Sequence, residues 1–331
     1  MSTVQATTMQ AITQRRYGSP EVLRLAKADR PVPGDDQVLV SVHAGGVNPA
    51  DWHYMTGKPY LVRIGGGGFL RPKRSIPGLD LAGRIEAVGK NVTVLKPGDD
   101  VFGEVGGAYA EYAVARQDDV VLKPATITHA QAAAVPIAAL TALQGLRDKG
   151  KLESGDKVLV NGASGGVGTF AVQIAKALGA DVTGVCSTRN VAMVRSIGAD
   201  HVVDYTQEDF TKSGDRYDVI LDTVGSRPLV ACKRLLVSDG IYVGVGGPKT
   251  SFLVLTRMLW MALLSLRGKQ KLVSMLAKQS KQDLEVLRGW LESGDIVPVL
   301  DRCYELSETE AALRHIGEGH AQGKIVITLG D

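Results

Sequence analysis

The period of the hydrophobic pattern changes along the chain. In the first third of the sequence, apolar and polar residues alternate over short stretches that Gly, Pro and Asp separate. This alternation is typical of half-buried β-strands. The expected strands are Gln37–Asn48, Leu81–Gly89, Asp99–Val105 and Tyr109–Ala115. Their spacing and the lack of a helical period predict a compact domain of the β-barrel type.

The middle of the chain alternates apolar strands with helical segments. Ala/Leu-rich helices are expected around Pro136, and apolar strands begin at Lys157, Asp181, His201 and Tyr217. Short strands separated by helices of about 10–15 residues predict βαβ units. We therefore expect an α/β fold whose doubly wound parallel sheet is covered by helices on both faces.

The last segment has a third pattern. An amphipathic helix, a strand, a second helix and a closing strand are expected at 284–294, 297–306, 309–319 and 324–329. If this tail returns to the first domain, the middle segment is an insertion, although composition does not decide this. The predicted domains are 1–129 with 268–331, and 130–267.

A glycine-rich turn gives the strongest local signal for chemistry. A buried strand, Val158–Asn161, enters a turn of the form G-x-x-G-x-x-G, which opens a helix. Glycines let the backbone approach a pyrophosphate, and the helix N-terminus presents free N–H groups to it. A tight βα turn without a ligand is the alternative. The predicted phosphate contacts are Ser164, Gly165, Gly166 and Val167.

The end of the next strand indicates which dinucleotide binds. An NAD site usually has Asp or Glu there, whereas this chain has Ser187 and Arg189. A serine hydroxyl and a guanidinium are suited to a 2′-phosphate, and Tyr205 adds a third donor. This pattern favours NADPH. The alternative is that Arg189 is an ordinary solvated surface residue. The predicted cofactor site further includes Asp222 and Gly246.

Composition and charge exclude several other classes. The net charge is +3 and aromatic residues make up 5%, so neither a basic nucleic-acid surface nor a stacking platform is indicated. The three cysteines are far apart, which favours a reducing compartment, and the N-terminus lacks a signal-peptide pattern. We expect a cytoplasmic protein. The apolar stretch Phe252–Leu266 is too short to span a membrane and predicts a buried or interface helix, with membrane attachment as the less favoured alternative.

Several segments together resemble the medium-chain dehydrogenase/reductase superfamily, in its zinc-free quinone oxidoreductase (zeta-crystallin-like) branch. The resemblance covers residues 31 to 327. It is carried by VLVSVHAGGVNPADW, PGLDLAG, AVGKNVTVLKPGDDVFG, NGASGGVG and GHAQGKIVI. It implies a GroES-like catalytic domain built from both chain ends and an inserted Rossmann domain that binds NADPH.

The resemblance also implies roles for particular residues. It places the Asn48–Asp51 stretch and Thr141 beside the nicotinamide. Asn48, Asp51 and His53 are the predicted catalytic residues, with His53 as a proton relay or oxyanion donor or, alternatively, a structural histidine. Zinc-dependent relatives have a cysteine where this chain has Asn48, a His–Glu pair where it has Leu79 and Asp80, and a third metal ligand near Ile137. These residues do not make a zinc site, so we predict no metal.

These features predict reduction of quinones or α,β-unsaturated carbonyl compounds by NADPH. A zinc-free alcohol or aldehyde dehydrogenase and a non-catalytic NADPH-binding protein are the alternatives. A homodimer is also predicted, because Gly240–Gly247 is interpreted as an edge strand that a second subunit would pair.

Overall fold

Two compact units form in the computed structural model, which describes residues 8–246 and 251–330. Unit 1 contains the chain up to Ile137, Gln279–Ser293 and the chain from Leu300 onward, and unit 2 contains Ala138–Lys278 and Gly294–Val299. The predicted boundaries, after residues 129 and 267, fall before these junctions. Helix α2 (His129–Ala133) still packs on unit 1, and the strand at residues 271–274 still extends the sheet of unit 2.

In unit 1, a long bent strand organises the sheet. Strand β3 (Gln37–Val47) pairs with β4 (Asp80–Val88) along one side. On its other side it pairs first with β6 (Tyr112–Arg116) and then with β15 (Lys324–Thr328). Two register shifts against β4 allow the bend. At Gly46, an added Cβ would lie 2.2 Å from the Ala133 carbonyl oxygen, so only glycine lets α2 approach the strand this closely.

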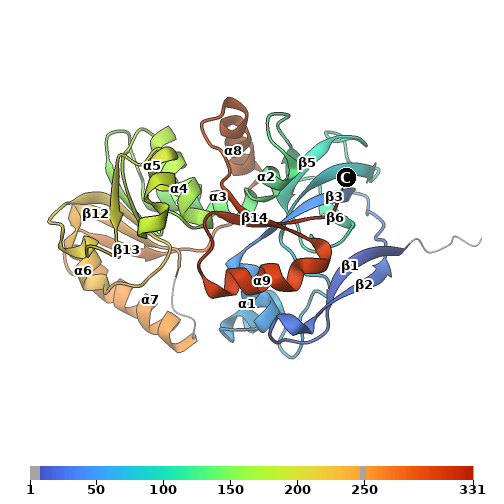
Figure 1. Ribbon diagram of the computed structural model, residues 1–331, viewed down its shortest axis with the longest axis horizontal. Helices are drawn as coiled ribbons and strands as arrows, with labels where there is room; N and C mark the ends of the chain where they lie inside the picture. Colours follow the sequence, from blue (N-terminus) through green and yellow to red (C-terminus); the bar gives the residue numbers. More distant parts are fainter. Residues whose placement is uncertain (1–7, 247–250, 331) are drawn as a thin grey trace, which may run out of the picture. The chain divides into compact units, whose positions relative to one another are not determined.

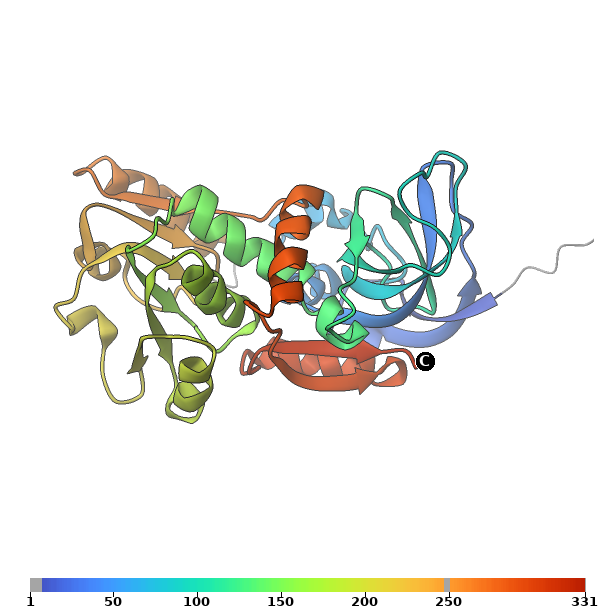
Figure 2. The same cartoon turned by 90° about the horizontal axis from the view of Figure 1, so that it is seen from above.

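The remaining elements of unit 1 complete the sheet and cover it. The sheet continues to β5 (Asp100–Glu104) and β7 (Val120–Leu122) beyond β4, and to β14 (Leu300–Glu305) beyond β15. A separate hairpin joins β1 (Thr8–Gln14) and β2 (Leu23–Asp29). Figure 2 shows the C-terminal strand pair in red with α9 (Thr309–Glu318), which packs against it. The other helices are α1 (Pro49–Thr56) and α8 (Lys281–Ser293). The C-terminal strands thus pair into the sheet of the first segment.

Unit 2 is built on a six-stranded parallel sheet with the order β10-β9-β8-β11-β12-β13. The strands are β8 (Lys157–Asn161), β9 (Asp181–Cys186), β10 (His201–Asp204), β11 (Tyr217–Asp222), β12 (Leu236–Gly244) and β13 (Lys271–Ser274). The helices are α3 (Pro136–Leu143), α4 (Gly166–Ala177), α5 (Val191–Ser196), α6 (Leu229–Arg234) and α7 (Ser251–Ser265). Figure 1 shows α4 and α5 on one side of the sheet and α6 and α7 on the other. The predicted doubly wound parallel sheet is confirmed.

The reason given above for a homodimer is wrong. The predicted edge strand corresponds to β12, and β12 pairs with β13 in the same chain from Ile241 to Gly244. Residue 247 of the predicted strand lies outside the described residues. The unpaired edge therefore belongs to β13, a strand of 4 residues. The homodimer stays a prediction that needs another reason.

The apolar stretch at residues 252–266 forms α7. Among the described residues, no helix is long and apolar enough to cross a membrane. One face of α7 is buried, with Met261 and Leu264, and the other is exposed, with Leu259 and Leu263, so of the expected buried or interface helix the interface alternative stays a prediction.

Candidate active site

The predicted cofactor residues of unit 2 gather at the carboxyl ends of neighbouring strands. Strand order reverses between β8 and β11, since β9 and β10 follow on one side and β12 and β13 on the other. Asn161, the last residue of β8, is in register with Asp222, the last residue of β11. Ligands of doubly wound sheets bind at such a switch point, outside the carboxyl ends of the strands.

The glycine-rich turn joins β8 to α4 with its helix N-terminus open. Gly165 is the N-cap of α4, and no side chain caps it. The first backbone N–H groups of a helix have no partner within the helix, so those of Gly166 and Val167 are suited to a phosphate. A Cβ at Gly168 would lie 2.0 Å from the Gly162 carbonyl oxygen, which explains the third glycine by close packing of turn and helix.

Asn190 connects this turn to the end of the next strand, a role that the sequence did not reveal. Its side-chain Nδ2 donates to Ser164 Oγ at 3.0 Å and to Ser187 Oγ at 3.2 Å. The side chain is buried, and its Oδ1 has no hydrogen-bond partner among the described residues. A buried acceptor without a donor is unfavourable. An adenosine ribose hydroxyl would supply the missing donor, so the residues present fit a dinucleotide.

The neighbourhood of the predicted 2′-phosphate site contains one carboxylate that sequence reasoning missed. Asp204 ends β10 in register with Cys186, so it lies beside the 186–189 segment. Its Oδ2 accepts from Thr188 Oγ1 at 2.6 Å, and this bond holds the pKa of Asp204 below its ordinary value. Arg189 and Tyr205 are both exposed near this point. The 186–189 segment itself contains no acidic residue, which favours NADPH. The carboxylate of Asp204 nevertheless lies beside this segment.

The other three predicted cofactor residues have different surroundings. Asp222 is 1% exposed, and its carboxylate accepts from Asn161 Nδ2, Tyr242 Oη and two backbone N–H groups, so it organises the turn after β11. At Gly246, a Cβ would lie 2.0 Å from the Thr223 carbonyl oxygen, in the same turn. Thr141 is buried on α3. Because the Asp222 carboxylate is already occupied within the protein, Gly246 is the better candidate for direct contact with the cofactor.

Unit 1 contains a buried polar cluster around Asn48. The Asn48 amide donates from Nδ2 to Asp80 Oδ2 at 2.8 Å and accepts at Oδ1 from Lys324 Nζ at 2.5 Å. Lys324 Nζ also donates to the Val47 carbonyl at 3.1 Å and lies 3.7 Å from Asp80 Oδ2. All three side chains are at most 3% exposed. These bonds fix the amide nitrogen and the amide oxygen of Asn48. They use one of the two Nδ2 hydrogens.

Burial acts in opposite directions on the two charges of this cluster. It raises the pKa of Asp80 to about 6 and lowers the pKa of Lys324, because each charged form loses water. Their mutual attraction opposes both shifts. Burial therefore disfavours both charges, and their contact with each other favours them. Sequence reasoning missed both residues, although the segments that contain them were among those that carried the family resemblance.

Asp51 lies in the same buried region, and its pKa is also raised. Its Oδ2 accepts from the Asn48 backbone N–H at 2.9 Å, which caps α1. Burial and the nearby Asp80 raise the pKa of Asp51 to about 7, so much of it is protonated at neutral pH. The Tyr109 hydroxyl can donate to the Asp51 carboxylate, which opposes this rise, and it lies 3.3 Å from the Gly46 carbonyl oxygen. Asp51 therefore suits the role of a residue that orients the turn, because its carboxyl caps α1.

His53 is held by the backbone. Its Nδ1 lies 2.7 Å from the Lys58 carbonyl oxygen, so Nδ1 carries the hydrogen and donates it. In the neutral ring Nε2 is then an acceptor, and it donates to a developing oxyanion only when the ring is protonated. This geometry favours the structural alternative for His53.

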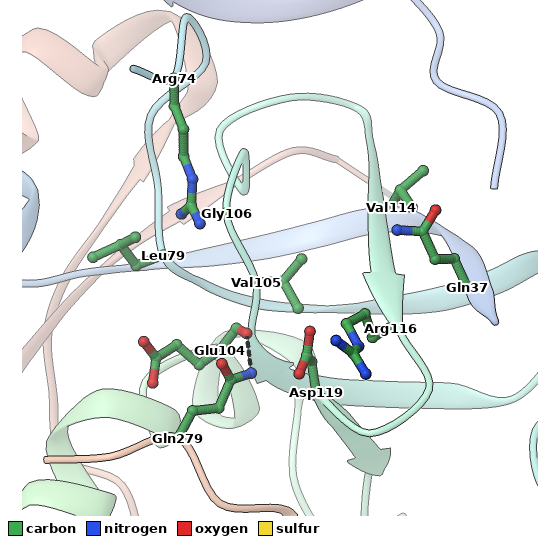
Figure 3. Close-up of a pocket in the computed structure, with 10 residues that line it drawn as sticks. All are labelled: Gln37, Arg74, Leu79, Glu104, Val105, Gly106, Val114, Arg116, Asp119 and Gln279. Carbon is green, nitrogen blue, oxygen red and sulfur yellow. Dashed lines mark hydrogen bonds between the residues drawn. The ribbon is translucent and has the colours of Figure 1, made fainter. Parts of the chain in front are cut away.

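A small polar cavity of about 230 Å³ lies in unit 1 (Figure 3). Arg74, Arg116, Glu104 and Asp119 contribute charged groups to its lining, and Gln279 Nε2 donates to the Glu104 carbonyl at 2.7 Å. Burial raises the pKa of Glu104 to about 7. The charged lining differs from the mostly apolar pockets that hold drug-sized organic ligands. The cavity therefore supplies no argument for a quinone or enone site.

Comparison with known proteins places the chain in a family. The alcohol dehydrogenase GroES-like domain family matches residues 34–125, and the zinc-binding dehydrogenase family matches residues 197–327. The chloroplast envelope quinone oxidoreductase homolog of Arabidopsis thaliana is 32% identical over 336 residues, which cover 96% of this chain and 98% of that protein. The chain belongs to the quinone oxidoreductase branch of the medium-chain dehydrogenase/reductase superfamily.

Two further relatives extend this result. The 2-methylene-furan-3-one reductase of Solanum lycopersicum is 34% identical, over 96% of this chain and 79% of its own length. The structure of the quinone oxidoreductase from Coxiella burnetii matches with a TM-score of 0.85 and 28% identity, over 98% of this chain and 100% of that chain. Since this superfamily consists of oxidoreductases that bind nicotinamide cofactors, the chain is an oxidoreductase of that kind, with a GroES-like domain and a Rossmann-like sheet.

Proposed function

We propose that this protein reduces quinones or α,β-unsaturated carbonyl compounds with NADPH and without zinc. The buried cluster of Asn48, Asp80 and Lys324 carries this proposal. The resemblance puts Asn48 at the position of a metal ligand in zinc-dependent relatives, and here its amide oxygen accepts from an ammonium group. The names of the relatives, a quinone oxidoreductase homolog and a 2-methylene-furan-3-one reductase, support the same substrate classes.

The donor set around Asn48 does not fit zinc, although one matching family is named for zinc binding. Zinc sites use Cys, His, Asp or Glu, and a catalytic site needs three of them. No group of three such residues that could hold a metal occurs in the described parts of the chain. At Asp80, the Lys324 ammonium supplies a positive charge, so a second cation there would be repelled.

The proposed chemistry divides between cofactor and protein. When bound, NADPH would supply a hydride to the electron-poor carbon of the acceptor, and a proton from water would complete the reduction. Negative charge then collects on the acceptor's carbonyl oxygen, where a fixed hydrogen-bond donor stabilises it. Asn48 is our candidate for this donor, because Lys324 and Asp80 hold its amide in one orientation and leave one Nδ2 hydrogen outside their contacts. Asp51 and Tyr109 hold the turn that carries Asn48.

The cofactor is proposed to lie across the ends of β8, β9, β11 and β12. The N-terminus of α4 would hold the pyrophosphate, and Ser164, Ser187 and Asn190 would contact the adenosine ribose. Arg189 is the cationic side chain proposed for the 2′-phosphate. The Asp204 carboxylate accepts hydrogen bonds from the hydroxyls of Thr188 and Thr206.

A spectroscopic assay tests this function. NADPH consumption is followed by its absorbance with a panel of quinones, enones, saturated ketones and aldehydes. Turnover of quinones or enones with little turnover of saturated carbonyls is expected. A preference for saturated aldehydes or alcohols, or binding of NADPH without any turnover, would contradict the proposal. A cytoplasmic location and a homodimer remain predictions of the sequence.

A further inference from the structure

Helix α7 presents an apolar stripe to solvent. The exposed fractions are 54% for Leu255, 62% for Leu259, 46% for Leu263 and 81% for Leu266, which follows the helix at residue 266. These positions recur every three or four residues and therefore lie along one face of a helix. Met258 and Trp260, 49% and 57% exposed, widen this stripe. Contiguous apolar surface of this kind marks an interaction site.

The opposite face holds α7 firmly to unit 2. Met261 and Leu264 are buried in the core cluster around Tyr242. Arg257 donates to the Tyr242 hydroxyl at 2.7 Å, and Lys233 Nζ donates to the Leu264 carbonyl at 2.5 Å. Because the inner face is anchored, the exposed stripe is a fixed feature of the surface.

The stretch of sequence around this stripe carries charges of one sign. The sequence contains no Asp or Glu between Gly240 and Gln282. The same stretch contains seven basic residues: Lys249, Arg257, Arg267, Lys269, Lys271, Lys278 and Lys281. Four of them, Arg267, Lys269, Lys271 and Lys278, are exposed. In a chain with 35 acidic residues, such a stretch produces a local positive field at the end of the apolar stripe.

We propose that α7 docks onto an anionic membrane surface, lying in the interface without crossing it. A helix with an apolar face, a tryptophan and flanking cations is suited to the boundary between headgroups and acyl chains. The exposed leucines would enter that boundary, and Arg267, Lys269 and Lys271 would meet anionic headgroups. In a symmetric contact, the same stretch of a second copy would bring its own cations against these, so self-association through this face is the less favoured occupant.

Vesicle binding by the full-length protein tests this proposal. Co-sedimentation is compared for vesicles of phosphatidylcholine alone and vesicles that also contain phosphatidylglycerol. We expect binding to the anionic vesicles and release by salt. The L259S/L263S double variant should lower the partition coefficient by about 10- to 100-fold. The K269Q/K271Q variant should lower it about 30-fold, at ~1 kcal/mol per cation.

Controls make the result specific to α7. The V32S/V94S variant changes two exposed apolar residues of unit 1, and K27Q/K96Q changes two exposed lysines there; both should bind like the wild type. Thermal melting checks that every variant folds. A blue shift of tryptophan emission on vesicle binding should disappear in W260F and persist in W290F. Failure of the wild type to bind anionic vesicles, or equal binding by L259S/L263S, would overturn the proposal. It would also be overturned if that variant converted a dimer into a monomer in light scattering.

Discussion

The two polar sites of this protein are assembled in different ways. The site in unit 2 is mostly local, because one strand, one turn and one helix between Lys157 and Ala177 make its phosphate-binding part. The site in unit 1 brings together residues from four distant segments, at Asn48–Asp51, Asp80, Tyr109 and Lys324. Its side chains bind one another, whereas the turn in unit 2 leaves backbone N–H groups for a ligand. The buried polar network of unit 1 is sensitive to the loss of any member, since each side chain satisfies the hydrogen bonds of another.

Loss of Lys324 should have the largest effect. Lys324→Met would leave Asp80 as an unpaired buried charge and would remove the donor to Asn48 Oδ1 and the Val47 carbonyl. Removing one partner of a buried ion pair costs about 3–5 kcal/mol. We expect a loss of this size in urea unfolding and a clear fall in kcat of the folded enzyme. The double variant Lys324→Met/Asp80→Asn should recover part of the stability. A cost below about 1 kcal/mol, the size of an exposed pair, would show that the cluster is not held as described.

The protonation of Asp51 should make stability depend on pH. The ordinary pKa of an unfolded aspartate is about 3.9, whereas burial raises the pKa of the folded residue to about 7. The folded state therefore keeps a proton that the unfolded state loses, and the stability from this residue is lost as pH rises between these two values. Asp51→Asn stays neutral and retains the N-cap acceptor.

Urea unfolding between pH 4 and pH 7.5 measures this effect, with pH values chosen around the two pKa values. The stability of Asp51→Asn relative to wild type should grow with pH by roughly 1.4 kcal/mol per unit across that range. The exposed Asp215→Asn serves as the control and should show no such trend. A flat difference for Asp51→Asn would mean that the carboxyl is ionised in the folded protein.

Arg189 tests the cofactor preference of unit 2. Arg189→Ala should weaken NADPH binding by about 10- to 150-fold, which corresponds to the ~1.5–3 kcal/mol of a charge-assisted hydrogen bond. NADH binding should change little, because NADH has no 2′-phosphate. Fluorescence titration of both cofactors measures the difference, and Arg216→Ala provides an exposed arginine of the same unit as a control. Equal losses for NADPH and NADH would remove Arg189 from the site.

His53 should have the smallest effect. Its Nδ1–H is committed to the Lys58 carbonyl, so we expect His53→Ala to lower kcat by less than about tenfold, or ~1.4 kcal/mol. His53→Asn keeps a donor near the position of Nδ1 and should restore kcat. A fall of about 100-fold or more that His53→Asn does not rescue, the size seen for a lost oxyanion donor, would return His53 to a direct role in the reaction.

Sequence reasoning predicted what depends on local pattern. Alternation and periodicity gave the strands around β3 and the parallel sheet of unit 2, and the glycine spacing gave the turn before α4. It did not find Asp80, Tyr109 or Lys324, because contact between residues separated by 276 positions leaves no periodic signal. Asn190 was missed because an amide shows its role only through the two serines that it bonds. The edge strand was misplaced because β13 has only four residues and too short a pattern to predict.

Metal content measured together with activity tests the central claim most directly. The protein is purified without chelator, its zinc is measured by mass spectrometry, and NADPH-dependent enone reduction is assayed before and after dialysis against a chelator. We predict far less than one zinc per chain and unchanged activity after dialysis, because the Asn48 amide oxygen accepts from Lys324 and neither side chain is a zinc ligand. One zinc per chain, lost on dialysis together with activity and regained with added zinc, would contradict the account.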